Sequence, residues 1–352
     1  MELDKYIIEL LKITGKMKIT EEEQTRLKAM LRDSAFASNK EVILKTICKH
    51  KLQYLFLKHL IEIHCIYWKE LRDISMTLSE RLAFLQIKYG EYLEDCAIIA
   101  ADLKKENIRY AILKGLSISH LLYVENGTLY RNFNDADFLI AKKNIIQVRE
   151  ILNKANYCQG YVDESYNIVR ASRKDLLFWS LNSHQEHKFI KPSKFFTFSP
   201  RHILKIDINT TIFEGGMVPI QIPTEELLLN IQSHKISTGF EFYSLNPTYE
   251  FIQLCYHFYK DSFQYKEKTV RQDGLIAMKM CDIHEYFIYN YEKIDWDVFF
   301  RTIYEANVYD KIAWVIKIVS DFYREEEMHR ILNHFCKNVG LPECPNWSII
   351  LL

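Results

Sequence analysis

Apolar residues recur every three to four positions over most of the first 105 residues. This period places them on one face of a helix, where they would pack against neighbouring elements. The longest such segment has four apolar residues on a single stripe: Leu82, Leu85, Tyr89 and Tyr92. The helices predicted in this region span residues 3–13, 20–33, 38–48, 51–75 and 77–105.

The pattern changes at Ile108 to short runs rich in β-branched and aromatic residues, which are typical of strands. A helix over residues 144–156 interrupts these runs. The predicted strands span residues 108–113, 136–141, 166–171, 176–180, 187–190, 194–198 and 203–208. Strands interspersed with a helix predict a small mixed sheet with helices on one side, and Pro223 ends this region.

Helical spacing returns after Pro223, in segments 224–236, 247–264, 268–290, 296–307 and 309–335. Long helices should dominate the chain, because only 10 Gly and 7 Pro occur in 352 residues. We therefore predict an α+β protein with three parts. These are an N-terminal helical region (1–105), a sheet-containing core (106–222) and a C-terminal helical domain (223–352). The active cleft would lie between the sheet and the C-terminal helices.

Asp135 and Asp137 stand two residues apart at a predicted strand, so both carboxylates would share one face, roughly 7 Å apart along the chain. Carboxylate oxygens in this arrangement suit a hard cation such as Mg²⁺. The pattern alone has low specificity, because Asp295-Trp-Asp297 repeats it in the same chain. The simpler interpretation is a solvated strand end or a cap for the helix that begins near Asn144.

The first predicted strand runs into Lys114-Gly115 and then into a short apolar helix that contains Ser117. A strand, a glycine turn and a helix start leave backbone N–H groups and the positive end of the helix dipole available to a phosphate. Lys114 and Arg131 would add positive charge. The simpler interpretations are an exposed Lys114, an Arg131–Glu125 ion pair, and Ser117 as a helix cap.

A third acid, Asp207, follows in the segment Ile203–Asn209, where apolar and polar residues alternate along a strand. Asp207 would share the polar face of this strand with Lys205 and Asn209. In nucleotidyl transfer, two carboxylates bind the metal that positions the phosphates, and a further acid helps to deprotonate the attacking hydroxyl. The simpler interpretation is a surface acid paired with Lys205.

The amino-acid composition limits the kinds of molecule that the chain is expected to bind. Lys and Arg together number 46, as do Asp and Glu, so no overall field attracts nucleic acid or an anionic membrane. Eight scattered cysteines without a Cys-x-x-Cys pair argue against a zinc ribbon or a disulfide scaffold and predict reduced thiols. No apolar run approaches the ~18 residues of a membrane span, and the N-terminal segment lacks the basic start of a signal peptide. We therefore expect a cytoplasmic protein without a membrane partner.

The ordered motifs resemble a bacterial family of poorly characterised nucleotidyltransferases in the polymerase-beta-like superfamily. The motifs that carry the resemblance are Leu113-Lys-Gly-Leu116, Tyr123, Arg131, Asp135-Ala-Asp-Phe-Leu-Ile140 and Leu204-Lys-Ile-Asp207. The similarity extends over most of the chain, including His184 and His187, Pro223-Thr-Glu-Glu-Leu227 with His234, Asp282-Ile283 and Ile294-Asp-Trp296. It implies transfer of a nucleoside monophosphate from an NTP such as ATP to an acceptor hydroxyl, with Mg²⁺ (or Mn²⁺) as cofactor and pyrophosphate as the second product.

The resemblance also implies roles for individual residues. The expected catalytic metal ligands are Asp135, Asp137 and Asp207. The expected nucleotide contacts are Lys114, Gly115, Ser117, Arg131, Lys279 and Asp282, and the expected substrate contacts are His184 and His187. Lys279 and Asp282 have a simpler interpretation as an ion pair within one helix. The two histidines lack a further ligand at zinc spacing, which argues against a zinc site.

The chain departs from the family pattern at two positions. Leu116 follows Gly115 where the superfamily has Gly or Ser, and Asn209 stands where relatives often have His; neither change removes a metal ligand. The acceptor expected from the family is the hydroxyl of a small molecule or peptide in natural-product biosynthesis. The alternatives are a toxin-like transferase acting on tRNA or protein and a catalytically silent binding or scaffold protein. A basic groove leading to Asp207 would favour an RNA acceptor.

Overall fold

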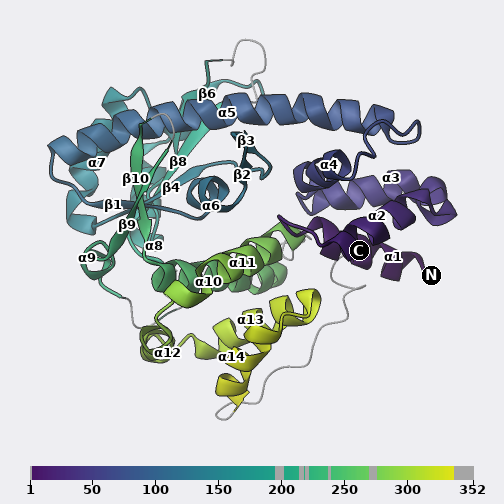
Figure 1. The fold of residues 1–352 in the computed structure, drawn as a ribbon. Coiled ribbons are helices and arrows are strands. Elements are labelled where there is room, and N and C mark those ends of the chain that lie inside the picture. Colours follow the sequence, from purple (N-terminus) through teal and green to yellow (C-terminus); the bar gives the residue numbers. More distant parts are fainter. Residues whose placement is uncertain are drawn as a thin grey trace.

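The computed structural model describes residues 2–194, 202–213, 218, 222–236, 239–268 and 276–336. Helices dominate it and surround a mixed sheet, so the predicted α+β class is confirmed (Figure 1). Buried apolar side chains form one continuous core from the first helix to the last described one. No helix in the described ranges has the length and hydropathy needed to cross a membrane.

The N-terminal region consists of α1 (Leu3–Thr14), α2 (Glu21–Arg32), α3 (Ser34–Lys49), α4 (Gln53–Glu62) and α5 (Arg72–Lys105). Local signals start two of these helices, because Thr20 and Glu23 form a capping box before α2 and Asp33 caps α3. The prediction of a single helix over 51–75 is wrong. The chain leaves α4 at His64, which adopts a left-handed conformation (φ 57°), and re-enters a helix only at α5.

The central sheet has the strand order β1-β4-β8-β7-β5-β6. Its strands are β1 (Tyr110–Leu113), β4 (Ala136–Ile140), β8 (Ile203–Asn209), β7 (Phe189–Pro192), β5 (Cys158–Val162) and β6 (Ile168–Arg170). Only β4 and β8 run parallel, and every other neighbouring pair is antiparallel. Two helices connect strands, α6 (Lys114–Leu122) and α7 (Ile145–Lys154), and a small hairpin of β2 (Val124–Glu125) and β3 (Thr128–Leu129) follows α6.

The long helix α5 crosses the sheet and is bonded to two of its strands (Figure 1). The Tyr92 hydroxyl accepts a hydrogen bond from the Lys205 N–H of β8 at 2.8 Å, and Asp95 forms an ion pair with Lys191 of β7. These polar contacts fix the position of the strands that carry the site described below.

One of the strand predictions in this core is wrong, and another falls mostly outside the described residues. Residues 176–180 belong to the helix α8 (Arg173–Asn182), because Ser172 and Asp175 form a capping box that starts a helix there. In the predicted strand 194–198, Lys194 lies in a turn and the remaining residues lie outside the described ones. Strand β5 was not predicted, and it packs so closely on β6 that a Cβ at Gly160 would lie 2.3 Å from the Val169 oxygen.

The prediction of a helix over 224–236 holds only for α9 (Thr224–Leu227). The chain then forms an antiparallel hairpin of β9 (Ile231–Lys235) and β10 (Glu241–Leu245). β10 lies against β1, where the rings of Tyr243 and Tyr110 meet edge to face, 5.5 Å apart. The strand conformation therefore depends on the pairing of β9 with β10 and on the packing of β10 against β1, which the local helical pattern did not reveal.

The C-terminal helices are α10 (Pro247–Lys268), α11 (Ala277–Asn290), α12 (Trp296–Glu305), α13 (Tyr309–Tyr323) and α14 (Glu326–Cys336). The helix predicted over 309–335 is two helices, because Arg324 adopts a left-handed conformation (φ 59°) between α13 and α14. The first part of the helix predicted over 268–290 falls on residues 269–275, outside the described ones. α11 packs against α6 and α10 against β10, which brings both helices next to the sheet (Figure 1).

Candidate active site

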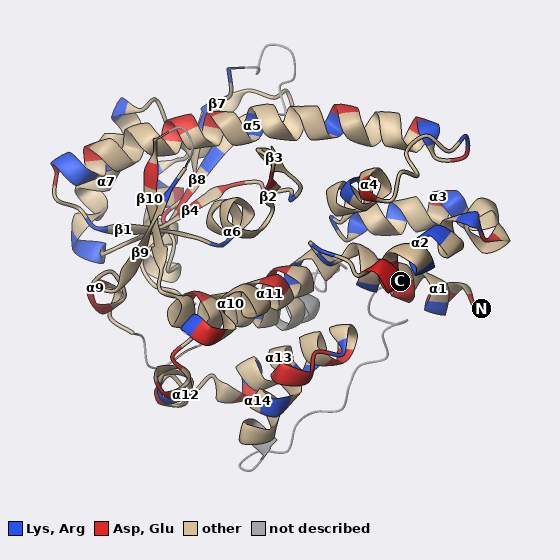
Figure 2. Ribbon diagram, viewed as in Figure 1, with Lys and Arg blue, Asp and Glu red and all other residues tan. Residues whose placement is uncertain are grey.

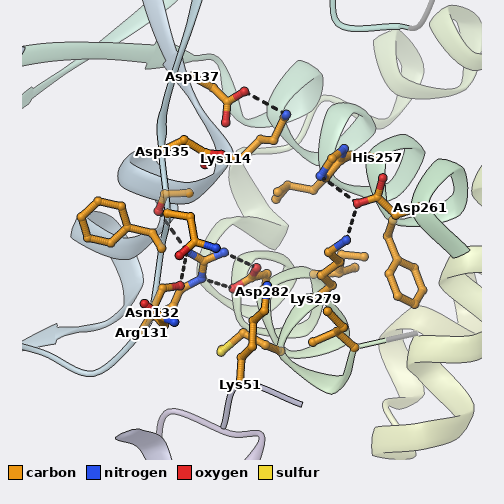
Figure 3. Close-up of a pocket in the computed structure, with 18 of the residues that line it drawn as sticks. Lys51, Lys114, Arg131, Asn132, Asp135, Asp137, His257, Asp261, Lys279 and Asp282 are labelled. Atoms are coloured by element: carbon orange, nitrogen blue, oxygen red, sulfur yellow. Dashed lines mark hydrogen bonds and ion pairs between the residues drawn. The ribbon is translucent and has the colours of Figure 1, made fainter. Parts of the chain in front are cut away.

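Asp135, Asp137 and Asp207 line one cleft at the end of the sheet, with a volume of about 350 Å³. Figure 3 shows Asp135 and Asp137 in this cleft. Asp137 lies directly opposite Asp207, because β4 and β8 are parallel and in register. Neighbouring strands are about 4.8 Å apart, so the two acids are adjacent. Asp135 immediately precedes β4. The sheet thus gathers on one cleft the three acids that are separated in the sequence.

The three carboxylates repel one another in a largely buried site. Burial raises the pKa of Asp207 to about 7, and the charge of Asp137 adds to this effect. Burial and Asp137 likewise raise the pKa of Asp135. Asp207 Oδ1 is buried and accepts no hydrogen bond from any described residue, while Lys188 Nζ lies 4.0 Å from Oδ2. A cation in the cleft would relieve this repulsion.

The carboxylates do not form a tight ligand cluster as they stand. Among the described residues, no three His, Cys, Asp or Glu side chains lie close enough together to hold a metal ion. Lys114 Nζ instead donates a hydrogen bond to Asp137 Oδ1 at 3.1 Å. Burial alone would lower the pKa of Lys114, but Asp137 and Asp135 raise it. Lys114 therefore neutralises part of the acidic charge.

Lys114 occupies the junction between β1 and α6 in a left-handed conformation with φ 43°. This conformation costs an ordinary residue roughly 1–2 kcal/mol, and the ion pair with Asp137 offsets part of that cost. The next residue, Gly115, leaves space beside the acids, since a Cβ there would lie 3.9 Å from Asp135 Oδ1. The predicted glycine turn is thus formed beside the carboxylates.

The two departures from the family pattern have different structural consequences. Leu116 is buried in the apolar core, so its side chain does not alter the surface of the cleft. Asn209 is also buried, and its Nδ2 donates a hydrogen bond to Asp137 Oδ1 at 3.2 Å. Gln185 in turn donates to Asn209 Oδ1 at 2.7 Å. Asn209 therefore helps to fix the position of the Asp137 carboxylate.

Arg131 and Asp282 pair with each other across the cleft wall (Figure 3). Arg131 Nε and Nη2 each donate to one Asp282 oxygen at 2.7 Å, which is a bidentate pair. Nη1 donates to the Gly115 carbonyl at 3.1 Å and to Ser119 Oγ at 2.9 Å. The simpler interpretation of an Arg131–Glu125 ion pair is wrong, because Glu125 pairs with Lys58. The simpler interpretation of a Lys279–Asp282 pair within one helix is also wrong, because Lys279 pairs with Asp261.

The opposite wall of the cleft comes from α10 and α11. It carries a second cluster of charged and polar side chains, besides the Arg131–Asp282 pair. Lys279 of α11 forms an ion pair with Asp261 of α10, and His257 Nε2 lies 3.3 Å from the same carboxylate. Burial lowers the pKa of His257 well below its usual value, and Lys114 adds to this effect. Lys51, from the loop between α3 and α4, reaches the cleft from the N-terminal region (Figure 3).

A family model identifies what kind of protein has this cleft. The model of an uncharacterised nucleotidyltransferase family matches residues 37–324, which is more than half of the chain. The chain belongs to this family. The predicted family and the predicted enzyme class, a nucleotidyltransferase with an NTP as substrate, are thereby confirmed. Enzymes of this type generally use divalent metals. No curated protein sequence matches the chain.

Three predicted contacts of the nucleotidyltransferase lie outside the main cleft. Ser117 neither caps α6 nor lines the cleft, because it lies inside the helix, fully buried and facing Glu250. His187 packs edge to face against Trp179 of α8. His184 lines a smaller hollow beside Lys114, and its segment is not helical, so the two histidines do not share a helix face. Burial, with Lys260, lowers the pKa of His184 to about 4.

Sequence reasoning missed the polar residues that α10 contributes. His257, Lys260 and Asp261 line the cleft at positions i, i+3 and i+4, which share one face of a helix. That spacing was a signal in the sequence, since it places an imidazole, an ammonium and a carboxylate together on one face of a helix. Nothing local indicated that Lys51 would join them, because the N-terminal helices reach the cleft only through tertiary packing.

Proposed function

We propose that this nucleotidyltransferase moves a nucleoside monophosphate from an NTP to a hydroxyl of a small-molecule or peptide acceptor and releases pyrophosphate. The observation that carries the proposal is the register of β4 and β8, which sets Asp137 opposite Asp207 beside the Lys114-Gly115 turn. Acids for a cation and a turn for phosphate thus line the same cleft.

The residues of the cleft fit a divalent cation, Mg²⁺ or Mn²⁺. Carboxylate oxygens are the ligands that these hard cations prefer, and Asp207 Oδ1 is buried without a hydrogen-bond partner among the described residues. Asp135, Asp137 and Asp207 would hold the metal. When bound, it would neutralise phosphate charge and polarise the transferred phosphoryl group.

Lysine side chains of the protein bind the triphosphate in addition to the metal. The Lys114 ammonium and backbone N–H groups at the start of α6 bind phosphate oxygens, and Lys51, Lys260 and Lys279 face the same cleft. Asp207 takes the proton of the acceptor hydroxyl, a role that its place in the cleft and its unpartnered Oδ1 allow. Arg131 bonds both to Asp282 of α11 and to the Gly115 carbonyl, and so holds the Lys114-Gly115 turn at a fixed distance from α11.

The charge distribution gives no specific support to a tRNA acceptor. Lys and Arg alternate with Asp and Glu over the described helices (Figure 2). Within the cleft, Lys114 and Lys279 are each paired with an acid. A groove for a polyanionic backbone would instead carry an excess of positive charge. The small-molecule or peptide hydroxyl is therefore the acceptor class that we propose.

Calorimetric titration with each of the four NTPs, with and without Mg²⁺, tests the proposal. We expect metal-dependent binding of at least one NTP, and its loss in the variant Asp135→Asn/Asp137→Asn. The matched control is Asp295→Asn/Asp297→Asn, which changes the other Asp-x-Asp. There Asp295 caps α12 and Asp297 is exposed, and Asn caps a helix equally well. Equal NTP binding by both double variants would refute the metal site.

A further inference from the structure

The helix α8 is unusual because none of its residues is buried. Leu177, Phe178 and Leu181 expose 58%, 64% and 74% of their surface. Six of the 18 large apolar residues exposed in the described chain lie between residues 161 and 181, so the exposure is concentrated rather than scattered. A helix of a globular protein ordinarily buries its apolar stripe. An exposed apolar patch of this kind marks an interaction surface.

The exposed residues form one face with a basic end. Lys174, Leu177, Phe178 and Leu181 stand at positions i, i+3, i+4 and i+7, which share a helix face. Lys174 is exposed at the N-terminal end of this stripe, and the nearby Arg170 and Arg173 are exposed as well. The neighbouring acid Asp175 is held in the capping box by Ser172. The face is therefore apolar with positive charge at one end.

Only a few residues of the chain separate α8 from the cleft. α8 ends at Asn182, and Gln185, three residues later, lines the cleft and donates to Asn209. Three residues span at most about 11 Å. The same connection carries His187, which packs on Trp179 of α8, and Lys188, which approaches Asp207. The C-terminal end of α8 is thus joined to the cleft by a short segment, so a molecule seated on α8 would lie near the cleft.

We propose that the exposed face of α8 docks the acceptor of the transferase, and that this acceptor is a polypeptide with an apolar segment next to acidic residues. The inference rests on the proposed function, because it assumes that an acceptor hydroxyl must reach Asp207. The apolar residues of the segment pack on Leu177, Phe178 and Leu181. Its acidic residues pair with Lys174 and the neighbouring arginines.

The size of the face favours a peptide over a second copy of the chain. A wholly buried aromatic side chain contributes about 150–250 Å², so three partly exposed apolar side chains offer roughly 300–450 Å². A stable dimer buries about 800 Å² on each partner. A short amphipathic segment matches the smaller area, and its recognition through i, i+3, i+4 and i+7 positions is a common mode.

Fluorescence anisotropy with two labelled model peptides tests the docking face. Both peptides carry Leu and Phe at helical spacing, and they differ only in having Glu or Lys at the flanking positions. We expect the Glu peptide to bind the full chain at least ten-fold more tightly than the Lys peptide. The variant Leu177→Gln/Phe178→Gln/Leu181→Gln should lose at least ten-fold in affinity for the Glu peptide.

The matched control is Val42→Gln/Ile61→Gln/Tyr304→Gln, which removes exposed apolar residues elsewhere and should bind the Glu peptide normally. Equal binding by wild type and the α8 variant, or absence of binding by the wild type, overturns the proposal. A dimer that the α8 variant dissociates, or phosphatidylserine vesicles that only the wild type binds, also overturns it.

Metal-dependent NTP binding separates this proposal from the proposed function. The α8 variant should bind Mg²⁺-NTP as tightly as the wild type in calorimetry, because α8 contributes no residue to the cleft lining found in the described chain. Loss of peptide binding with intact NTP binding supports the docking face. Intact peptide binding by α8 in a chain that binds no NTP would leave the docking face standing and refute the nucleotide site.

Discussion

At the scale of single residues, Arg131 shows how burial changes the interpretation of a charged motif residue. Its guanidinium is buried, and its donors are directed to Asp282, Gly115 and Ser119. An arginine with these partners holds protein groups in place. The resemblance to the family implied a nucleotide contact, and that contact stays a prediction.

We predict that Arg131→Met destabilises the fold by about 3–5 kcal/mol, because Asp282 would remain buried without its partner. Urea denaturation of both proteins measures the free energy of unfolding. The control is Arg330→Met, which removes the exposed pair with Glu327 and should cost about 1 kcal/mol or less. Similar costs for the two variants would contradict a structural role for Arg131.

At the scale of elements, the backbone conformation of the turn between β1 and α6 leaves space for a ligand beside the acids. Lys114 adopts a left-handed conformation, and Gly115 has no side chain to fill the space beside Asp135. The nearest heavy atom to a Cβ at Gly115 would be the Asp135 carbonyl oxygen at 3.4 Å, an ordinary contact distance. The protein itself therefore has room for a methyl group there, and a ligand would need that room.

We predict that Gly115→Ala leaves the free energy of unfolding within about 1 kcal/mol of wild type, because the contact is ordinary and alanine favours a helix. The affinity for Mg²⁺-NTP should fall at least ~10-fold, or about 1.4 kcal/mol. The control is Gly90→Ala in α5, where a Cβ meets no atom within 4 Å. It should stabilise the protein by about 0.5–1 kcal/mol with unchanged NTP binding. Unchanged affinity in Gly115→Ala would argue against phosphate binding at the turn.

A second prediction at this scale concerns His284, which connects α11 to the junction of α13 and α14. Burial alone would lower the pKa of His284, but hydrogen bonds to Glu285 and Glu325 raise it. A raised folded-state pKa stabilises the fold below the unfolded pKa of about 6.5, and this stability is lost as the pH rises through the folded-state value. The wild type should therefore exceed His284→Gln in stability by more at about pH 5.5 than at about pH 8.5.

Urea denaturation at both pH values measures this difference, and other titrating groups cancel because they are common to the two proteins. The control is His329→Gln, since the His329 side chain is half exposed. A difference between wild type and His284→Gln that is independent of pH, or larger at alkaline pH, would show that His284 is not charged in the fold.

Elements were predicted well where one local signal decides, and poorly where local signals compete or where strand pairing decides. The helical stripe of α5 and the alternation in β8 appear directly in the sequence. The run Leu176-Leu-Phe-Trp-Ser180 has the composition of a buried strand, but the Ser172–Asp175 capping box starts a helix, and no neighbouring strand pairs with it. β9 adopts its conformation because it pairs with β10.

At the scale of the whole molecule, the N-terminal helices take part in the site. Lys51 follows α3 and lines the cleft, and the preceding His50 accepts a hydrogen bond from the Ala277 N–H at 3.2 Å. The His50 carbonyl also accepts from the Met278 N–H. These bonds satisfy backbone donors at the start of α11, which has no side-chain cap of its own. The loop before α4 thus connects the N-terminal region to α11.

We predict that Lys51→Gln weakens Mg²⁺-NTP binding by roughly 10-fold, as expected for the loss of one charge-assisted hydrogen bond. Calorimetry measures the affinity, and thermal unfolding checks that the fold is intact. The control is Lys45→Gln, because Lys45 is an exposed lysine paired with Glu41 on the surface of α3. Equal affinities of the two variants for Mg²⁺-NTP would show that Lys51 does not contact the nucleotide.

The sequence by itself determined the α+β class, the position of most helices and the identity of the three acids, because these depend on short-range periodicity and on residue chemistry. Only the tertiary structure decided that Asp137 faces Asp207, that Arg131 pairs with Asp282, and that His257 and Lys51 border the same cleft. Such pairings join residues separated by tens to hundreds of positions. The register of non-local strands and the packing of distant helices set them, and no local pattern encodes either.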